Sequence, residues 1–187
     1  MAENKTKKLF STVLADCPWS RSQFGNYGAI NHYNLMPLDK IKAMPISDLA
    51  APNSHLYLWV TNNAVPDGLE VLEAWGYRYI TMFTWVKMKL GLGNYIRNST
   101  EQVLFGVRGK LPVNYKSQPS WGLYGVQDHS HKPEEFHEVV KKLSPGPYLE
   151  LFARRPYPGF SVWGNDPNIQ SDVDIPGYPV PNLRKEA

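Results

Sequence analysis

Short, nearly continuous apolar runs are the main feature of this chain. Such runs predict strands that are covered on both faces of a sheet, because a strand with one wet face would alternate apolar and polar residues. Turn-forming residues bound most of them. The runs expected to form strands are Phe10–Ala15, His55–Val60, Tyr79–Val86, Gln102–Val107, Tyr148–Phe152 and Ser161–Trp163.

Between these runs, apolar residues recur with helical spacing in three segments. Residues 38–49 carry an imperfect apolar stripe that Pro45 interrupts, which predicts a short helix followed by a turn. Residues 66–75 begin with a proline and are followed by a glycine, the usual start and stop signals of a helix. A third helix is expected to begin at Pro133, with acidic residues at its positive end.

The alternation of strands and helices predicts an α/β fold with a mostly parallel sheet and helices on both faces. We expect one domain over residues 9–166. Residues 1–8 are basic and are expected to be a flexible lead-in, and the proline-rich residues 167–187 are expected to trail off as a tail. The polar segments 20–34, 89–100 and 111–128 have no sustained period and are expected to be loops.

Composition narrows the class of protein only slightly. The formal charge of +3 and the pI of about 8.9 are compatible with a nucleic-acid partner. The single cysteine excludes an internal disulfide and fits a reducing cytoplasm. No apolar run approaches the roughly 18 residues that span a bilayer, and no signal peptide opens the chain, so we expect no membrane partner. The five histidines lack the spacing of a metal site.

The first predicted strand is followed by the string Asp16-Cys17-Pro18-Trp19, the strongest candidate for chemistry. Pro18 has no N–H and favours an extended Cys17, so the strand cannot continue. Asp16 then lies at the carboxyl edge of the sheet, where open α/β sheets bind ligands. A carboxylate beside the flat face of Trp19 suits a purine with an exocyclic amino group. The alternative is an ordinary turn at a strand end.

Other signatures of nucleotide chemistry are missing from the sequence. It contains neither a Gly-x-Gly-x-x-Gly string nor a phosphate-loop motif, which argues against a dinucleotide oxidoreductase or a nucleoside-triphosphate enzyme. The polar residues 61–63 follow the second predicted strand and are expected at the same sheet edge as Asp16.

Several strings, taken in order from Leu9 to Asp166, together resemble one family. It is the family of adenine-N6 methyltransferases named for the catalytic subunit of the eukaryotic messenger-RNA adenosine methyltransferase, which includes bacterial and phage members. The matching strings are Leu14–Trp19, Leu58–Thr61, Trp85–Lys87, Glu101–Gly109, Ser130–Glu135, Leu143–Gly146, Glu150–Arg154 and Trp163–Asn165. The resemblance implies a Rossmann-like methyltransferase fold with permuted motif order, S-adenosylmethionine as cofactor and N6-methyladenine as product.

The resemblance also implies roles for the first string, in which the family pattern is Asp-Pro-Pro-Trp. Asp16, Pro18 and Trp19 match, and Cys17 departs from the pattern. In the family, the acid and the backbone carbonyl of the next residue accept hydrogen bonds from the target amino group, and Cys17 supplies the same carbonyl. Two acceptors favour a tetrahedral nitrogen whose lone pair can attack the methyl group. Trp19 would stack on an unstacked or single-stranded base.

Further site residues follow from the same resemblance. The residues expected to bind the cofactor are Asp16, Lys132, Phe152, Arg154, Asn165 and Asp166. The residues expected to bind the substrate are Trp19, Tyr33, Trp85 and Glu101. Three of them have plainer alternatives: core packing for Phe152, a helix cap or a phosphate contact for Lys132, and an ordinary surface position for Tyr33.

The expected function is therefore transfer of a methyl group from S-adenosylmethionine to N6 of adenine in nucleic acid, in a cytoplasmic enzyme of bacterial or phage origin. We expect DNA as the substrate, with RNA as the alternative, and a homodimer or a partner subunit for target recognition. A rival from another class is a non-catalytic nucleic-acid-binding subunit of a methyltransferase complex. A second rival uses Cys17 as a nucleophile in cytosine ring methylation, although that chemistry usually shows Pro before Cys.

Overall fold

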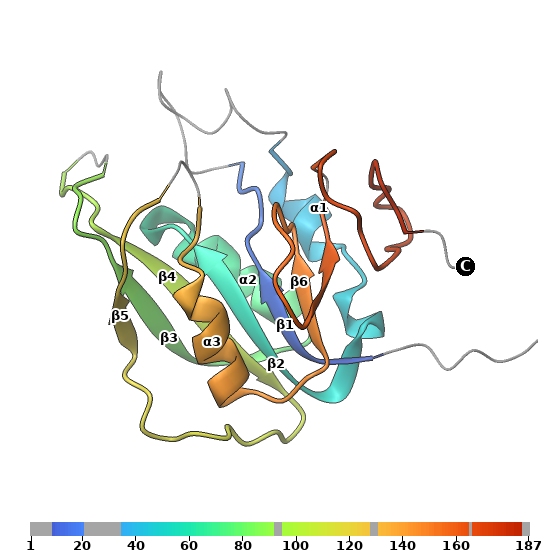
Figure 1. Ribbon diagram of the computed structural model, residues 1–187, viewed down its shortest axis with the longest axis horizontal. Coiled ribbons are helices and arrows are strands. Elements are labelled where there is room, and N and C mark those ends of the chain that lie inside the picture. Colours follow the sequence, from blue (N-terminus) through green and yellow to red (C-terminus); the bar gives the residue numbers. More distant parts are fainter. Residues whose placement is uncertain (1–8, 21–34, 92–94, 128–130, 165, 185–187) are drawn as a thin grey trace, which may run out of the picture.

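The computed structural model describes residues 9–20, 35–91, 95–127, 131–164 and 166–184. Its centre is a seven-stranded sheet in the order β5-β3-β4-β2-β1-β6-β7 (Figure 1). The strands are β1 (Phe10–Ala15), β2 (Ala50–Val60), β3 (Arg78–Val86), β4 (Thr100–Arg108), β5 (Trp121–Leu123), β6 (Tyr148–Leu151) and β7 (Phe160–Trp163). The helices are α1 (Leu38–Lys42), α2 (Val65–Ala74) and α3 (Glu135–Leu143), with short 3-10 turns η2 (Ile46–Asp48) and η3 (Asn62–Ala64).

Parallel pairing dominates the sheet, as the sequence predicts. β1 pairs in parallel with β2 and β6, β6 with β7, and β3 with β5. β4 is antiparallel to both of its neighbours, β2 and β3. The apolar core of β1 explains its central place, because Val13 and Leu14 point to opposite faces and both are buried.

Helices cover both faces of the sheet. On one face, α1 and α2 pack on Val13, Leu58 and Val60 in the larger apolar cluster. On the other face, α3 packs its Phe136 and Val140 against aromatic residues of β2 and β3. Gly106 of β4 allows α2 to come this close, because a Cβ there would lie 2.1 Å from Leu72 Cδ2. The prediction of an α/β fold with helices on both faces is confirmed.

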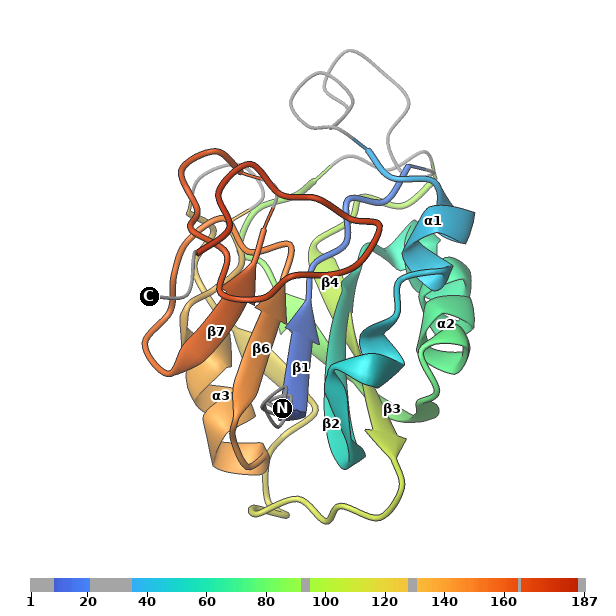
Figure 2. The same ribbon diagram turned by 90° about the vertical axis from the view of Figure 1, so that its right-hand side faces the viewer.

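Two segments differ from expectation. The expected loop 111–128 contains the short edge strand β5, which pairs with the last residues of β3. Residues 167–184, expected to trail off, instead pack on the domain: Ile175 is buried in the larger cluster, and Tyr178 donates a hydrogen bond to the Lys40 carbonyl of α1 at 2.7 Å. Figure 2 shows this segment in red, passing from β7 towards α1.

The other elements lie close to their predicted positions. β2 begins at Ala50 rather than His55, and the turn after α1 takes the form of η2. Within the described ranges, no helix combines the length and the apolar character required to cross a membrane.

Candidate active site at the carboxyl edge of the sheet

Every described strand except β4 ends at the same edge of the sheet. β1, β2, β6 and β7 run in one direction, and β3 and β5 share that direction because β3, like β2, is antiparallel to β4. The residues that follow β1, β3 and β6 therefore converge where β4 begins, which is the edge where open α/β sheets bind ligands.

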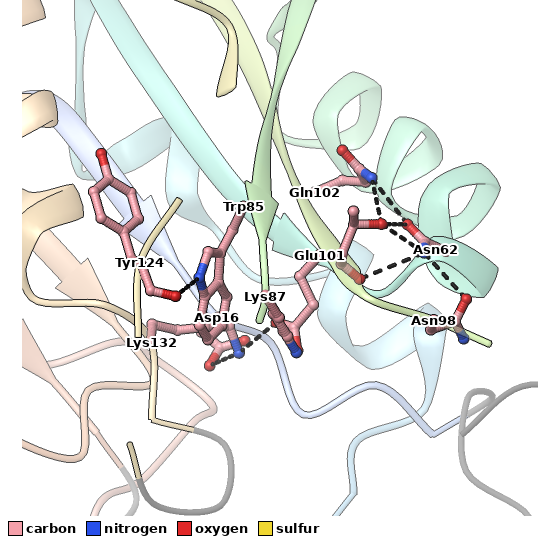
Figure 3. Close-up of polar contacts among 10 residues, drawn as sticks. Asp16, Asn62, Trp85, Lys87, Asn98, Glu101, Gln102, Tyr124 and Lys132 are labelled. Carbon is pink, nitrogen blue, oxygen red and sulfur yellow. Dashed lines mark hydrogen bonds and ion pairs between the residues drawn. The ribbon is translucent and has the colours of Figure 1, made fainter. Parts of the chain in front are cut away.

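Four charged residues with alternating signs meet at this edge, and we call them the charged tetrad: Asp16, Lys132, Glu101 and Lys87. The Lys132 Nζ atom lies 2.8 Å from Asp16 Oδ2 and 3.3 Å from Glu101 Oε2. The other oxygen of Glu101, Oε1, accepts a hydrogen bond from Lys87 Nζ (Figure 3). Asp16 follows β1, Lys87 follows β3, Glu101 opens β4, and Lys132 precedes α3.

Burial strengthens the coupling within the charged tetrad, because charges interact more strongly away from water. The Lys132 and Glu101 side chains are each 18% exposed. Burial alone would raise the pKa of Glu101, but the cations Lys132 and Lys87 outweigh it, so the pKa is lowered. Burial alone would lower the pKa of Lys132, but Asp16 and Glu101 raise it above its ordinary value. Glu101 and Lys132 are therefore both ionised at neutral pH.

Asp16 keeps an oxygen available in this arrangement. Only its Oδ2 atom bonds Lys132, and its Oδ1 atom has no hydrogen-bond partner among the residues that the structure describes. The carboxylate is partly exposed at the sheet edge. Asp16 therefore has one oxygen held by Lys132 and one available acceptor, and its contact with an amino N–H stays a prediction.

The next residue, Cys17, is held in a tight turn. Its carbonyl accepts a hydrogen bond from the Trp19 N–H at 2.9 Å, and since a carbonyl oxygen has two lone pairs, it can accept another. Cys17 as a whole is only 3% exposed. Burial, and secondly the nearby Asp16 charge, raise the pKa of the Cys17 thiol well above its ordinary value. The thiol is therefore a poor candidate for a nucleophile.

Trp19, which was expected to stack on the base, and Trp85, which was expected to bind the substrate, are both buried. Trp19 is 7% exposed, and its Nε1–H donates to the Trp59 carbonyl at 3.1 Å. Trp85 is 2% exposed, and its Nε1–H donates to the Tyr124 carbonyl at 3.0 Å. The expectation of open stacking faces does not fit this geometry, because each indole N–H is satisfied by a backbone carbonyl that holds the ring in the protein. Glu101 bridges two lysines, and its expected contact with the substrate stays a prediction.

A cavity of about 460 Å³ opens beside the charged tetrad. It lies between the residues before α3 and the residues that follow β6 and β7. The expected cofactor residues that line it are Asp16, Lys132, Phe152, Arg154 and Asp166. The structure thus brings together five of the six residues expected at the cofactor; the sixth, Asn165, lies outside the described residues, as does Tyr33.

Phe152 packs on the core at the wall of the cavity, and its contact with the cofactor stays a prediction. Its ring meets Trp163 edge to face at 5.1 Å and also lines the cavity. It has φ 62°, a conformation uncommon for a residue with a side chain. Such outliers cluster at functional sites, and here the turn ends β6 at the cavity wall. Asp166 is held by a local turn, since its Oδ1 accepts the Asn168 N–H at 2.8 Å.

Glu150 and His137 are cavity residues to which the sequence analysis assigned no role. His137 Nε2 lies 2.9 Å from Glu150 Oε2, so this nitrogen donates to the carboxylate. The His137 ring stacks on Tyr157 at 4.0 Å between centroids. In the sequence, Glu150 is a carboxylate within an apolar run, and a buried carboxylate needs a hydrogen-bond partner. This feature could have marked Glu150 as a candidate site residue. Its position inside the string Glu150-Leu151-Phe152 pointed to the cavity as well.

A network of hydrogen bonds between uncharged side chains lies on the other side of the charged tetrad. Asn62, in the η3 turn after β2, donates to Asn98 Oδ1 at 3.2 Å and to Thr100 Oγ1 at 3.1 Å. Its own Oδ1 accepts from Gln102 Nε2 at 2.9 Å (Figure 3). Residues 61–63 thus lie at the predicted edge, and Asn62 ties the end of β2 to the start of β4 beside Glu101.

The chain is similar to a known protein family and to several of its members. The sequence profile of the family MT-A70 matches residues 10–166. A Medicago truncatula protein named "Putative N(6)-adenosine-methyltransferase MT-A70-like" is 30% identical over 154 residues, which cover 78% of this chain and 24% of that protein. The human "N(6)-adenosine-methyltransferase catalytic subunit METTL3" is 31% identical over 156 residues, covering 78% and 26%. The chain spans about a quarter of the length of these relatives.

A shorter relative aligns over most of its length. The "Type II methyltransferase M.MunI" of Mycoplasma sp. is 29% identical over 181 residues, which cover 84% of this chain and 78% of that protein.

Proposed function

The chain belongs to the MT-A70 family, and from this premise we propose that it is a methyltransferase that transfers a methyl group from S-adenosylmethionine to N6 of adenine in nucleic acid. The family match and the seven-stranded sheet confirm the Rossmann-like α/β methyltransferase fold. The observation that carries the proposal is the position of Asp16 at the cavity: its Oδ2 is held by Lys132, and its Oδ1 has no hydrogen-bond partner among the described residues.

These two acceptors suit an amino group that is a weak nucleophile. The N6 lone pair of adenine is delocalised into the ring and becomes reactive only when the nitrogen turns tetrahedral. Hydrogen bonds from the two N–H groups to Asp16 and to the Cys17 carbonyl favour that geometry, and preorganised acceptors of this kind stabilise the transition state. The methyl carbon that bonds to N6 would leave the sulfonium sulfur, which would keep the electron pair of the broken S–C bond, and the proton that N6 loses would pass to the Asp16 carboxylate and from there to water.

The residues around the cavity fit S-adenosylmethionine, which when bound supplies a methyl group on a sulfonium sulfur. Lys132 would hold the carboxylate of its methionine end. Glu150 shares one oxygen with His137, and its other oxygen has no hydrogen-bond partner among the described residues, so it would accept from ribose hydroxyls. Phe152 supplies apolar surface, and Arg154 and Asp166 supply polar groups at the wall. A volume of about 460 Å³ lies within the range of small-molecule sites.

We propose DNA as the substrate and RNA as the alternative. The similarity to the Mycoplasma type II methyltransferase is the reason for placing DNA first, and the similarity to the plant and human adenosine methyltransferases is the reason for keeping RNA as the alternative. A homodimer or a partner subunit would supply target recognition. We propose a cytoplasmic enzyme, because a reducing compartment suits the single cysteine, which is buried and unpaired, and a bacterial or phage origin, because of the similarity to the Mycoplasma protein.

Two rival functions fit the geometry less well. A cysteine nucleophile needs an accessible thiolate, whereas the Cys17 thiol is buried and its pKa is raised. A non-catalytic subunit has no need for a carboxylate held with a free oxygen at the cavity, which is what Asp16 provides.

The test is transfer of a tritiated methyl group to double-stranded DNA, single-stranded DNA and RNA, followed by identification of the labelled nucleoside. The proposal predicts N6-methyladenine and a clear preference for DNA. Labelled 5-methylcytosine would point to the Cys17 mechanism. Cofactor binding by calorimetry without transfer to any of the three substrates would favour the non-catalytic subunit.

A further inference from the structure

Lys87 lies outside the roles assigned so far, although it belongs to the charged tetrad. We propose that Lys87 is a positioning residue: it holds one oxygen of Glu101, so that Lys132 stays on Asp16 and the free Asp16 oxygen faces the target amino group. The inference rests on the proposed function, since it concerns the same site. Lys87 itself does not line the cavity.

The sheet fixes Lys87 with unusual rigidity for a lysine. It directly follows β3, whose last residues pair with the start of β4, including Trp85 opposite Glu101. Its backbone N–H donates to the Ser99 carbonyl at 2.7 Å. Its ammonium lies 4.6 Å from the ring centroid of the buried Trp85, a favourable cation–π distance. Only one polar partner of the ammonium is described, and that partner is Glu101.

Glu101 divides its two oxygens between the two lysines. Oε1 is bonded by Lys87 and Oε2 lies 3.3 Å from Lys132 Nζ. Lys132 therefore has one oxygen of Glu101 and one oxygen of Asp16, the latter nearer at 2.8 Å. Without Lys87, both Glu101 oxygens would compete for Lys132 and draw its ammonium away from Asp16. Asp16 would then lose the contact that fixes its orientation.

The charge balance of the charged tetrad also indicates that Lys87 keeps the site ionised. The charged tetrad contains two lysines and two carboxylates, and its formal charges cancel. The charged groups facing Glu101 come from three elements: Lys87 from β3, Lys132 from the segment before α3, and Asp16 beyond it from β1. Removal of Lys87 leaves one ammonium between two carboxylates, so a carboxylate binds a proton at a higher pH than before.

The alternative is that Lys87 only stabilises the edge of the sheet. Measurements of kcat and of its pH dependence distinguish the two roles. We would compare Lys87→Met with Lys87→Arg, and use Lys89→Met as the matched control, because Lys89 is exposed two residues along the same segment. For Lys87→Met we expect kcat to fall by about 10- to 100-fold, as for a small misplacement of reacting groups. KM for S-adenosylmethionine should change less than threefold, and the acidic limb of the kcat–pH profile should move to higher pH. Lys87→Arg should restore most of kcat.

A crystal structure of the Lys87→Met variant supplies a readout that needs no activity. The proposal predicts that Lys132 moves towards both oxygens of Glu101 and away from Asp16. If the Lys132–Asp16 distance stays at 2.8 Å, or if kcat and its pH profile match those of Lys89→Met, the proposal is overturned. Lys87→Gln replaces Lys87→Met if that variant does not fold. Absence of methyl transfer by the wild-type protein, together with movement of Lys132 in the variant, would overturn the proposed function and would still show that Lys87 keeps Lys132 on Asp16.

Discussion

Replacement of Lys132 by methionine tests the charged tetrad as a source of stability. The substitution keeps the apolar stem and removes the ammonium that lies 2.8 Å from Asp16 and 3.3 Å from Glu101. Asp16 is then left without its cation, while Glu101 keeps Lys87. The variant should therefore be less stable at neutral pH, because a mostly buried carboxylate is no longer compensated.

The expected loss in the free energy of unfolding follows from the burial of the Lys132 side chain. Breaking a fully buried ion pair costs about 3–5 kcal/mol. The Lys132 side chain is 18% exposed and one of its two partners retains a second lysine, so we expect the lower end, about 3 kcal/mol. In a protein of this size, that loss corresponds to a decrease of about 6–12 °C in Tm.

The pH dependence gives the sharper test. In the wild-type protein the pKa of Glu101 is lowered, so its contribution to stability is present above its ordinary pKa and is lost as the pH falls. In Lys132→Met, Glu101 loses one of the two cations that lower its pKa, so this pKa rises. The free-energy difference between variant and wild type should therefore be full at pH 8 and should shrink as the pH falls through the raised pKa of Glu101 in the variant.

Urea unfolding of both proteins at pH 8, 6 and 4.5 measures this difference. Lys116→Met is the control, because Lys116 is exposed and should change the free energy of unfolding by less than about 0.5 kcal/mol at each pH. A loss for Lys132→Met that is the same at all three pH values would refute the electrostatic reasoning and point to lost packing alone.

Three further predictions concern other parts of the chain. Cys17→Ala and Cys17→Pro should both yield N6-methyladenine by mass spectrometry of digested nucleosides, because only the carbonyl is used; loss of activity in both, with normal cofactor binding, would revive the thiol mechanism. Burial lowers the pKa of His55, so wild-type stability should fall as the pH drops below about 6.5, and urea unfolding of His55→Gln should lack that decline. Gly106→Ala should lower the free energy of unfolding by about 1–3 kcal/mol through overlap with Leu72, whereas Gly125→Ala, with nothing within 4 Å of the added Cβ, should be near neutral; equal effects would contradict the packing argument.

The strands of the core could be predicted from the sequence because their apolar runs are nearly continuous and are bounded by turn-forming residues. β1 spans the predicted residues Phe10–Ala15, and β6 differs by one residue at its end. β5 could not be predicted, since three residues carry no period and the strand forms only by pairing with the end of β3. The packing of Ile175 on the domain also depends on distant contacts that no local pattern records.

The candidate site was predictable in part. The string at Asp16 and its place at the sheet edge follow from the strand that precedes it and from Pro18. The partnership of Asp16 with Lys132 does not, because it joins residues 116 positions apart and depends on the order of the strands. The burial of Trp19 and Trp85 was missed for a similar reason: each indole N–H finds a carbonyl on another segment.

The central claim is that Asp16 accepts a hydrogen bond from the target amino group during methyl transfer. Its most direct test is the single-turnover rate of Asp16→Ala, with S-adenosylmethionine binding measured by calorimetry and with Asp39→Ala, an exposed acid on α1, as the control. The account predicts a rate about 10²–10³-fold below that of the wild-type protein, with a folded variant and a normal rate for the control. A rate for Asp16→Ala within threefold of the wild-type rate would show that the chemistry takes place elsewhere.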